Sequence, residues 1–153
     1  MISATDPAAD FSLPRDGGGT VTLSALRPGK VVLYFYPKDD TPGCTLEAQD
    51  FNARLADFTA AGATVIGISK DSVKSHDKFC KKHGLGIVLA SDETGTTCED
   101  YGVWQEKSMY GKTYMGIQRA TFLIGGDGRV ARVWPKVSVK GHADEVLAAV
   151  KAL

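Results

Sequence analysis

Three cysteines are the residues of this sequence best suited to covalent chemistry, and Cys44 is the strongest candidate among them. It follows a Thr-Pro-Gly turn that separates a buried apolar segment from a helical pattern. A thiol at a helix N-terminus is favoured as the thiolate, because the helix dipole and unpaired backbone N–H groups stabilise negative charge there. The thiolate is the nucleophile. We therefore expect a reactive cysteine here, although such a thiol also serves elsewhere as a small apolar residue in a core.

The spacing around this cysteine excludes dithiol exchange within the same loop. A disulfide oxidoreductase of the thioredoxin type needs a second cysteine three residues away, and those positions hold Thr41 and Glu47. The Thr41 hydroxyl is instead able to hydrogen-bond both a thiolate and a bound oxygen substrate. A cation from elsewhere in the chain would stabilise the developing negative charge.

These residues resemble the active-site signature of the peroxiredoxins. Pro37, Thr41 and Cys44 match its pattern P-x-x-x-T-x-x-C, and Thr45 and Glu47 extend the match to C-T-x-E. Segments 102–107, 111–114 and 116–124 are similar to the Q subfamily, the bacterioferritin comigratory proteins. The resemblance covers nearly the whole chain.

The resemblance implies a role for each matching residue. Cys44 would be the peroxidatic cysteine, and Arg119 would hold its thiolate and polarise the peroxide. Thr41 would bind the peroxide through its hydroxyl, and Pro37 would shield the pocket. Without the resemblance, Arg119 is more simply interpreted as the partner of a carboxylate on the sheet.

The resemblance also implies the reaction. The thiolate attacks one oxygen of hydrogen peroxide or an alkyl hydroperoxide, releases water or an alcohol, and becomes a sulfenic acid. No metal or organic cofactor is expected. A dithiol protein of the thioredoxin type is the implied reductant.

The residues leave open which thiol resolves the sulfenic acid. Many Q-type members carry that cysteine five residues after the peroxidatic one, where this chain has Gln49. The resemblance then favours Cys80 and a disulfide with Cys44, with Cys98 or an external thiol as alternatives. We expect Cys98 to be an inert, packed thiol. A disulfide needs Cα atoms within about 7 Å, which two separately packed helices rarely offer, so local unfolding after Cys44 is expected.

A metal site is the main alternative from another class. His76, Cys80 and His83 recur at helical spacing and would share one face of a helix. Structural zinc usually takes four ligands, and His142 and Cys98 lie on other elements, so we expect no metal. A thioredoxin-fold binding module without turnover is a second alternative.

The elements that position these residues follow an α/β pattern. Strands are expected at 11–13, 20–23, 31–36, 63–69, 87–90, 116–124 and 129–134, and helices at 45–61, 72–83, 94–101 and 144–153. Asp71 or Ser72 caps the second helix, Gly84 ends it, residues 102–115 form a polar loop and 125–128 a hairpin turn. We expect one domain, 1–153, with a mixed central sheet flanked by helices on both faces and an N-terminal β-hairpin. The resemblance to peroxiredoxins implies that this is a thioredoxin-like fold.

Composition excludes several other classes. The 153 residues carry 18 basic and 18 acidic side chains, so no positive excess favours nucleic acid or an anionic membrane. A hydrophobic content of 43% is typical of a folded chain, and no apolar run is long enough to cross a membrane. An odd number of cysteines and no signal-like N-terminus favour a reducing, cytoplasmic setting. By analogy with Q-type members we expect a monomer.

Overall fold

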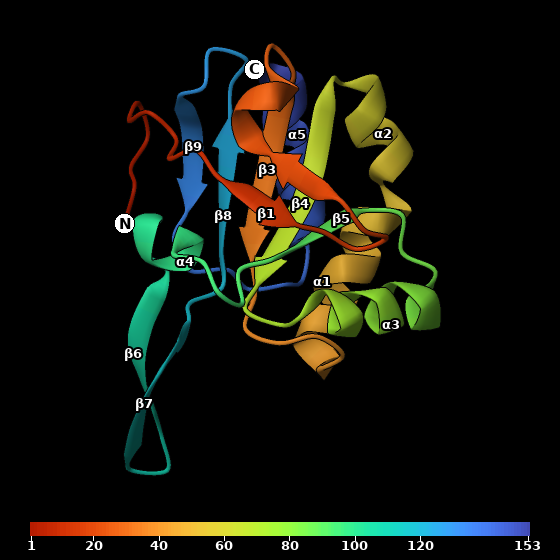
Figure 1. Cartoon of the computed structure of the whole chain (residues 1–153). Coiled ribbons are helices and arrows are strands. Elements are labelled where there is room, and N and C mark those ends of the chain that lie inside the picture. The colour runs from red at the N-terminus through yellow and green to blue at the C-terminus, as the bar shows by residue number, and fades with distance from the viewer.

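The computed structural model describes all residues, 1–153, and is built around a five-stranded sheet (Figure 1). The strand order is β5-β4-β3-β8-β9, with bounds β3 (Lys30–Phe35), β4 (Ala63–Ser69), β5 (Val88–Ser91), β8 (Ala120–Ile124) and β9 (Val130–Trp134). β3, β4 and β5 are parallel, whereas β8 and β9 run antiparallel to their neighbours. The predicted α/β fold with a mixed central sheet is confirmed.

The sheet separates two apolar clusters. Val31, Leu33 and Phe35 of β3 belong to one cluster, and the alternating Val32 and Tyr34 belong to the other. The second cluster is completed by helices α1 (Pro42–Ala53), α2 (Leu55–Ala60), α3 (Val73–His83) and α5 (His142–Ala152). The first is completed by α4 (Thr97–Asp100), the 3-10 helix η1 (Leu23–Leu26) and the hairpin of β1 (Ser12–Pro14) and β2 (Thr20–Thr22). None of these helices combines the length and the apolar character needed to cross a membrane.

The helix predicted over 45–61 starts earlier and is broken. Pro42 occupies the first helical position of α1, where its missing N–H costs nothing. Arg54 leaves the helical region with φ −107° and ψ 9°, and α2 begins at the next residue. α2 packs on β4 and α5.

Residues 104–117 form a β-hairpin, so the prediction of a polar loop over 102–115 was wrong. β6 (Trp104–Met109) pairs with β7 (Lys112–Ile117) in a ribbon that projects from the body of the molecule (Figure 1). The hairpin turns at Tyr110 and Gly111, both with positive φ, which is typical of a two-residue hairpin turn. Its faces are largely exposed, so no apolar alternation marks it in the sequence.

The single strand predicted over 116–124 is divided because its first residues belong to the projecting hairpin and the others to the central sheet. β7 ends at Ile117 inside the projecting hairpin, and β8 begins at Ala120 inside the central sheet. Gln118 and Arg119 therefore stand between two sheets.

The remaining predictions agree with the structure apart from their ends. The Ser72 hydroxyl caps α3 by accepting a bond from the Ser75 N–H at 3.1 Å, and Gly84 ends the helix with φ 63°. The 125–128 turn joins β8 to β9. The short helix predicted over 94–101 is reduced to α4, and the last helix begins two residues early, at His142.

Phe51 holds α1 on the sheet, and its removal provides a test of this packing. The ring is fully buried and stacks on Tyr34 with centroids 4.7 Å apart. We expect Phe51→Ala to lower the free energy of unfolding by about 3–5 kcal/mol, measured by chemical denaturation, because a large cavity remains. Leu46→Ala, on the exposed side of the same helix, should change it by no more than about 0.5 kcal/mol. Equal losses in the two variants would contradict this account.

Candidate active site

Cys44 lies in the first turn of α1 and is shielded from solvent. It is the third residue of the helix, where backbone N–H groups have no intrahelical partner. Its side chain is part of the apolar cluster beneath the helix, with 1% of the residue exposed. The Sγ atom accepts a hydrogen bond from Nη2 of Arg119 at 3.3 Å. A helix N-terminus and a guanidinium thus both stabilise a negative sulfur.

Arg119 reaches this thiol because of its place in the sheet. Ala120 pairs with Phe35 at the end of β3, so the residue before it lies beside the segment that leads into α1. Gly43 leaves room for the approach, since a Cβ there would lie 3.3 Å from Nη2 of Arg119. Burial lowers the pKa of Arg119, but the neighbouring Glu47 and Cys44 outweigh this effect and raise it, so the side chain stays cationic.

Glu47 belongs to the same group, which the sequence analysis did not predict. Its Oε1 accepts a bond from Nη1 of Arg119 at 2.6 Å, while its Oε2 is buried without a partner. Burial raises the pKa of Glu47 to about 7, against the opposing effect of Arg119. The available signal was a glutamate three residues after Cys44, on the same helix face. Arg119 is therefore also the partner of a carboxylate, although this carboxylate lies on α1 and not on the sheet as expected.

Thr41 and Pro37 lie at the entrance to α1 and make different contacts. Thr41 is the N-cap residue, and its hydroxyl donates to the Lys38 carbonyl oxygen at 2.9 Å. It makes no hydrogen bond to Cys44 here. Because this hydroxyl donates its proton to the Lys38 carbonyl oxygen, its own oxygen is left to accept a hydrogen bond from a ligand. Pro37 is exposed and borders a cavity.

That cavity is the largest in the molecule and is bordered by Pro37 and Lys38 of the segment that leads into α1. Its volume is about 540 Å³. It is lined by Pro37, Lys38, Lys70, Asp71, Trp104, Lys107, Met109, Tyr114, Met115, Gly116 and Ile117. Most of these residues come from the β6–β7 hairpin, which forms one wall, and Cys44 is not among them. Tyr110 stands at the exposed tip of the hairpin and takes no part.

Cys80 and Cys98 lie on opposite sides of the sheet, and all three cysteines are free. Cys80, on α3, packs against the apolar cluster that contains Cys44. Burial, together with Asp16 and Asp39, raises the pKa of Cys80 to about 12. Cys98 is fully buried in the other cluster, where burial raises the pKa of its thiol. Only Cys80 shares a face of the sheet with Cys44.

The structure does not assemble the alternative metal site. Both ring nitrogens of His76 have other partners, at 2.7 Å from Asp39 and 3.0 Å from the Ala90 carbonyl. His83 lies 3.0 Å from Asp40 instead. His142 contacts the Thr121 hydroxyl at 2.8 Å. No three His, Cys, Asp or Glu side chains are grouped so that they could hold a metal ion.

Comparison with known proteins agrees with this arrangement. The AhpC/TSA family profile matches residues 4–133. A relative named peroxiredoxin Bcp, from Xanthomonas campestris, is 53% identical over 148 residues, which cover 95% of this chain and 92% of that protein. A crystal structure of a PrxQ mutant from Xylella fastidiosa superposes with a TM-score of 0.94 at 43% identity, covering 99% of this chain and 97% of that one.

A second solved structure is that of the X. campestris bacterioferritin comigratory protein, which is described as having alkyl peroxide reduction activity. Its TM-score is 0.88 at 51% identity, and the match covers 93% of this chain and 90% of that chain. A buried cysteine paired with an arginine, on a fold shared with these proteins, leads to one conclusion. The chain belongs to the peroxiredoxins, as a thiol peroxidase of the Bcp or Q group.

Proposed function

We propose that this chain reduces hydrogen peroxide and alkyl hydroperoxides through a sulfenic acid formed on Cys44. The observation that carries the proposal is the 3.3 Å contact between the Cys44 Sγ and Arg119 Nη2 in the first turn of α1. The alkyl peroxide activity named for the X. campestris relative supports the same substrate class. We further propose that residues 1–153 act as one monomeric domain in the cytoplasm, without a metal or organic cofactor, as the resemblance implies.

In the first step the Cys44 thiolate attacks the terminal oxygen of the peroxide. The sulfur–oxygen bond forms as the O–O bond breaks, and the leaving oxygen departs with the bonding electrons and takes up a proton to become water or an alcohol. Arg119 donates hydrogen bonds where negative charge moves from sulfur to oxygen. Thr41 accepts a hydrogen bond from the peroxide O–H and so orients it, because the Thr41 hydroxyl donates its own proton to the Lys38 carbonyl oxygen. Pro37 borders the approach from the cavity.

In the second step Cys80 resolves the sulfenic acid. Its sulfur attacks the Cys44 sulfur, water leaves, and a disulfide forms that a thioredoxin-type dithiol then reduces. The shared apolar cluster favours Cys80, whereas Cys98 would have to cross the sheet. Burial, with Asp16 and Asp39, raises the pKa of Cys80 to about 12 and so disfavours the thiolate, which is the attacking form. Resolution by an external thiol is the alternative.

Intact mass after one equivalent of peroxide tests both cysteine roles. Wild type should lose two hydrogens, and Cys80→Ser should gain one oxygen and stop thioredoxin-coupled turnover, because no internal thiol then closes the disulfide. Cys44→Ser should consume no peroxide. Cys98→Ser is the matched control and should behave as wild type. Normal turnover by Cys80→Ser would assign resolution to another thiol, and turnover by Cys44→Ser would refute the assignment of the nucleophile.

The protonation of Glu47 should appear in the pH dependence of the first step. Because its pKa is about 7, raising the pH from 6 to 8 ionises Glu47, and its charge then competes with the thiolate for Arg119. Glu47→Gln keeps the shape of the side chain and removes this titration. We expect the ratio of variant to wild-type second-order rate constants for peroxide to rise by roughly three- to tenfold over that interval.

The control for this experiment is Glu93→Gln, which changes an exposed glutamate between β5 and α4. Its ratio to wild type should stay constant with pH, since Glu93 has no contact with Arg119. A constant ratio for Glu47→Gln as well would show that Glu47 does not share the charge of Arg119.

A further inference from the structure

The segment that leads into the active site is fastened to α3 by two consecutive carboxylates. His76 Nδ1 donates to Asp39 Oδ2 at 2.7 Å, and His83 Nε2 lies 3.0 Å from Asp40 Oδ1. The two histidines stand two turns apart on α3, and Cys80 lies between them in the chain. Both bonds therefore connect the approach to Cys44 with the helix that carries the second thiol.

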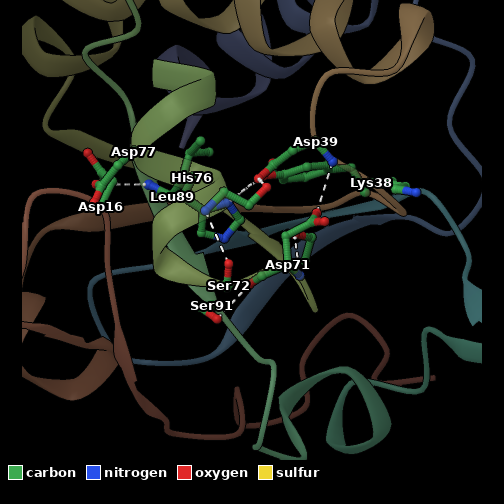
Figure 2. Close-up of polar contacts among 12 residues, drawn as sticks. Asp16, Lys38, Asp39, Asp71, Ser72, His76, Asp77, Leu89 and Ser91 are labelled. Atoms are coloured by element: carbon green, nitrogen blue, oxygen red, sulfur yellow. Dashed lines mark hydrogen bonds and ion pairs between the residues drawn. The ribbon is translucent and has the colours of Figure 1, made fainter. Parts of the chain in front are cut away.

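The inner pair, Asp39 and His76, is buried, and both side chains make further hydrogen bonds (Figure 2). The side chains of His76 and Asp39 are 0% and 3% exposed. Asp39 Oδ1 accepts from the Tyr36 hydroxyl at 2.5 Å, and its Oδ2 also accepts from the Ser75 hydroxyl at 2.8 Å. His76 Nε2 faces the Ala90 carbonyl at 3.0 Å, an oxygen that only accepts. Both ring nitrogens thus carry protons, and the pair is an imidazolium with a carboxylate.

The charges agree with this protonation. Burial alone lowers the pKa of His76, but the bond to Asp39 and its charge outweigh burial and raise it. Removing one member of such a pair leaves the other charge buried without compensation, which is strongly unfavourable. The outer pair, Asp40 and His83, is weaker, because Asp40 is 44% exposed and exposed ion pairs contribute little to stability.

The backbone of the segment is fastened at the same point. The Asp39 N–H donates to Asp71 Oδ2 at 2.9 Å, and the Ser69 hydroxyl donates to the same oxygen at 2.7 Å (Figure 2 shows the Asp39–Asp71 bond). Asp39 lies two residues before the N-cap Thr41 and five residues before Cys44. Its bonds therefore hold the chain just ahead of the turn in which the thiol meets Arg119.

We propose that the Asp39–His76 pair is a positioning device that favours the arrangement reacting with peroxide over the arrangement forming the Cys44–Cys80 disulfide. This inference rests on the proposed function, in which Cys80 resolves the sulfenic acid. With the pair intact, the segment before α1 stays fixed to α3, and Cys44 stays in its helical turn against Arg119. Weakening the pair frees that turn, so the first step slows and the second accelerates.

The test is Asp39→Asn, which keeps the shape of the side chain and removes its charge. Rapid-quench mass spectrometry follows one turnover and separates sulfenic acid, which gains an oxygen, from disulfide, which loses two hydrogens. We expect the second-order rate constant for peroxide to fall and the first-order rate constant for disulfide formation to rise, each by roughly three- to tenfold. Loss of both rates together, or no change in either, would overturn the proposal.

Asp92→Asn is the matched control for a merely structural effect. Asp92 is also a fully buried carboxylate, and it bonds the Thr97 and Cys98 N–H groups of α4. Its loss should lower thermal stability without accelerating disulfide formation. Acceleration of similar size in this control would show that general loosening, and not the Asp39–His76 pair, governs the second step.

Ser75→Ala provides a second variant in case Asp39→Asn does not fold. It removes one donor to Asp39 Oδ2 and leaves no charge unpaired. Its two rate constants should shift in the same opposite directions by about twofold, and a shift of both in one direction would overturn the proposal. If wild-type protein forms no disulfide, the proposed role of Cys80 is refuted. In that case the positioning role of the pair is still tested by the peroxide rate constant of Asp39→Asn, and an unchanged value would refute it.

Discussion

The partly buried guanidinium of Arg119 is the interaction on which the active segment of this peroxiredoxin depends. Arg119 stands between the Cys44 sulfur and the Glu47 carboxyl, and both of these side chains are almost completely shielded from water. Transfer of an anion from water into such a site is costly unless a partner of opposite charge is bonded to it. Two acidic groups compete for one guanidinium here, so the protonation of either one alters the charge available to the other.

Arg119 reaches the active segment because it lies where the chain passes from the two-stranded sheet to the central sheet. β7 leaves for the projecting hairpin and β8 runs antiparallel to β3, so Arg119 falls between two ladders, at the end of β3 where the active segment starts. The same exchange of sheets places the β6–β7 hairpin as one wall of the neighbouring cavity. One irregularity therefore positions the cation and shapes the approach for substrate.

The two proposed steps make opposite demands on this arrangement. Reaction with peroxide requires Cys44 to stay in an ordered helical turn against Arg119, whereas disulfide formation requires the same turn to approach Cys80. The Asp39–His76 pair connects the segment before α1 to α3, and in our proposal it stabilises the first arrangement. A buried pair is suited to this purpose, because its bonds are either all present or lost together with a large free-energy cost.

The sequence by itself determined the features that depend on neighbouring residues. The strand, turn and helix around Cys44 and the cap of α3 follow from local patterns, and the resemblance singled out Arg119. Only the tertiary structure revealed Glu47 as the partner of Arg119, 72 residues away, and Asp39 as the partner of His76, 37 residues away. It also revealed the exposed hairpin, which no buried face marks in the sequence. Charged pairs and exposed strands are decided by which segments approach one another, and no local periodicity encodes that approach.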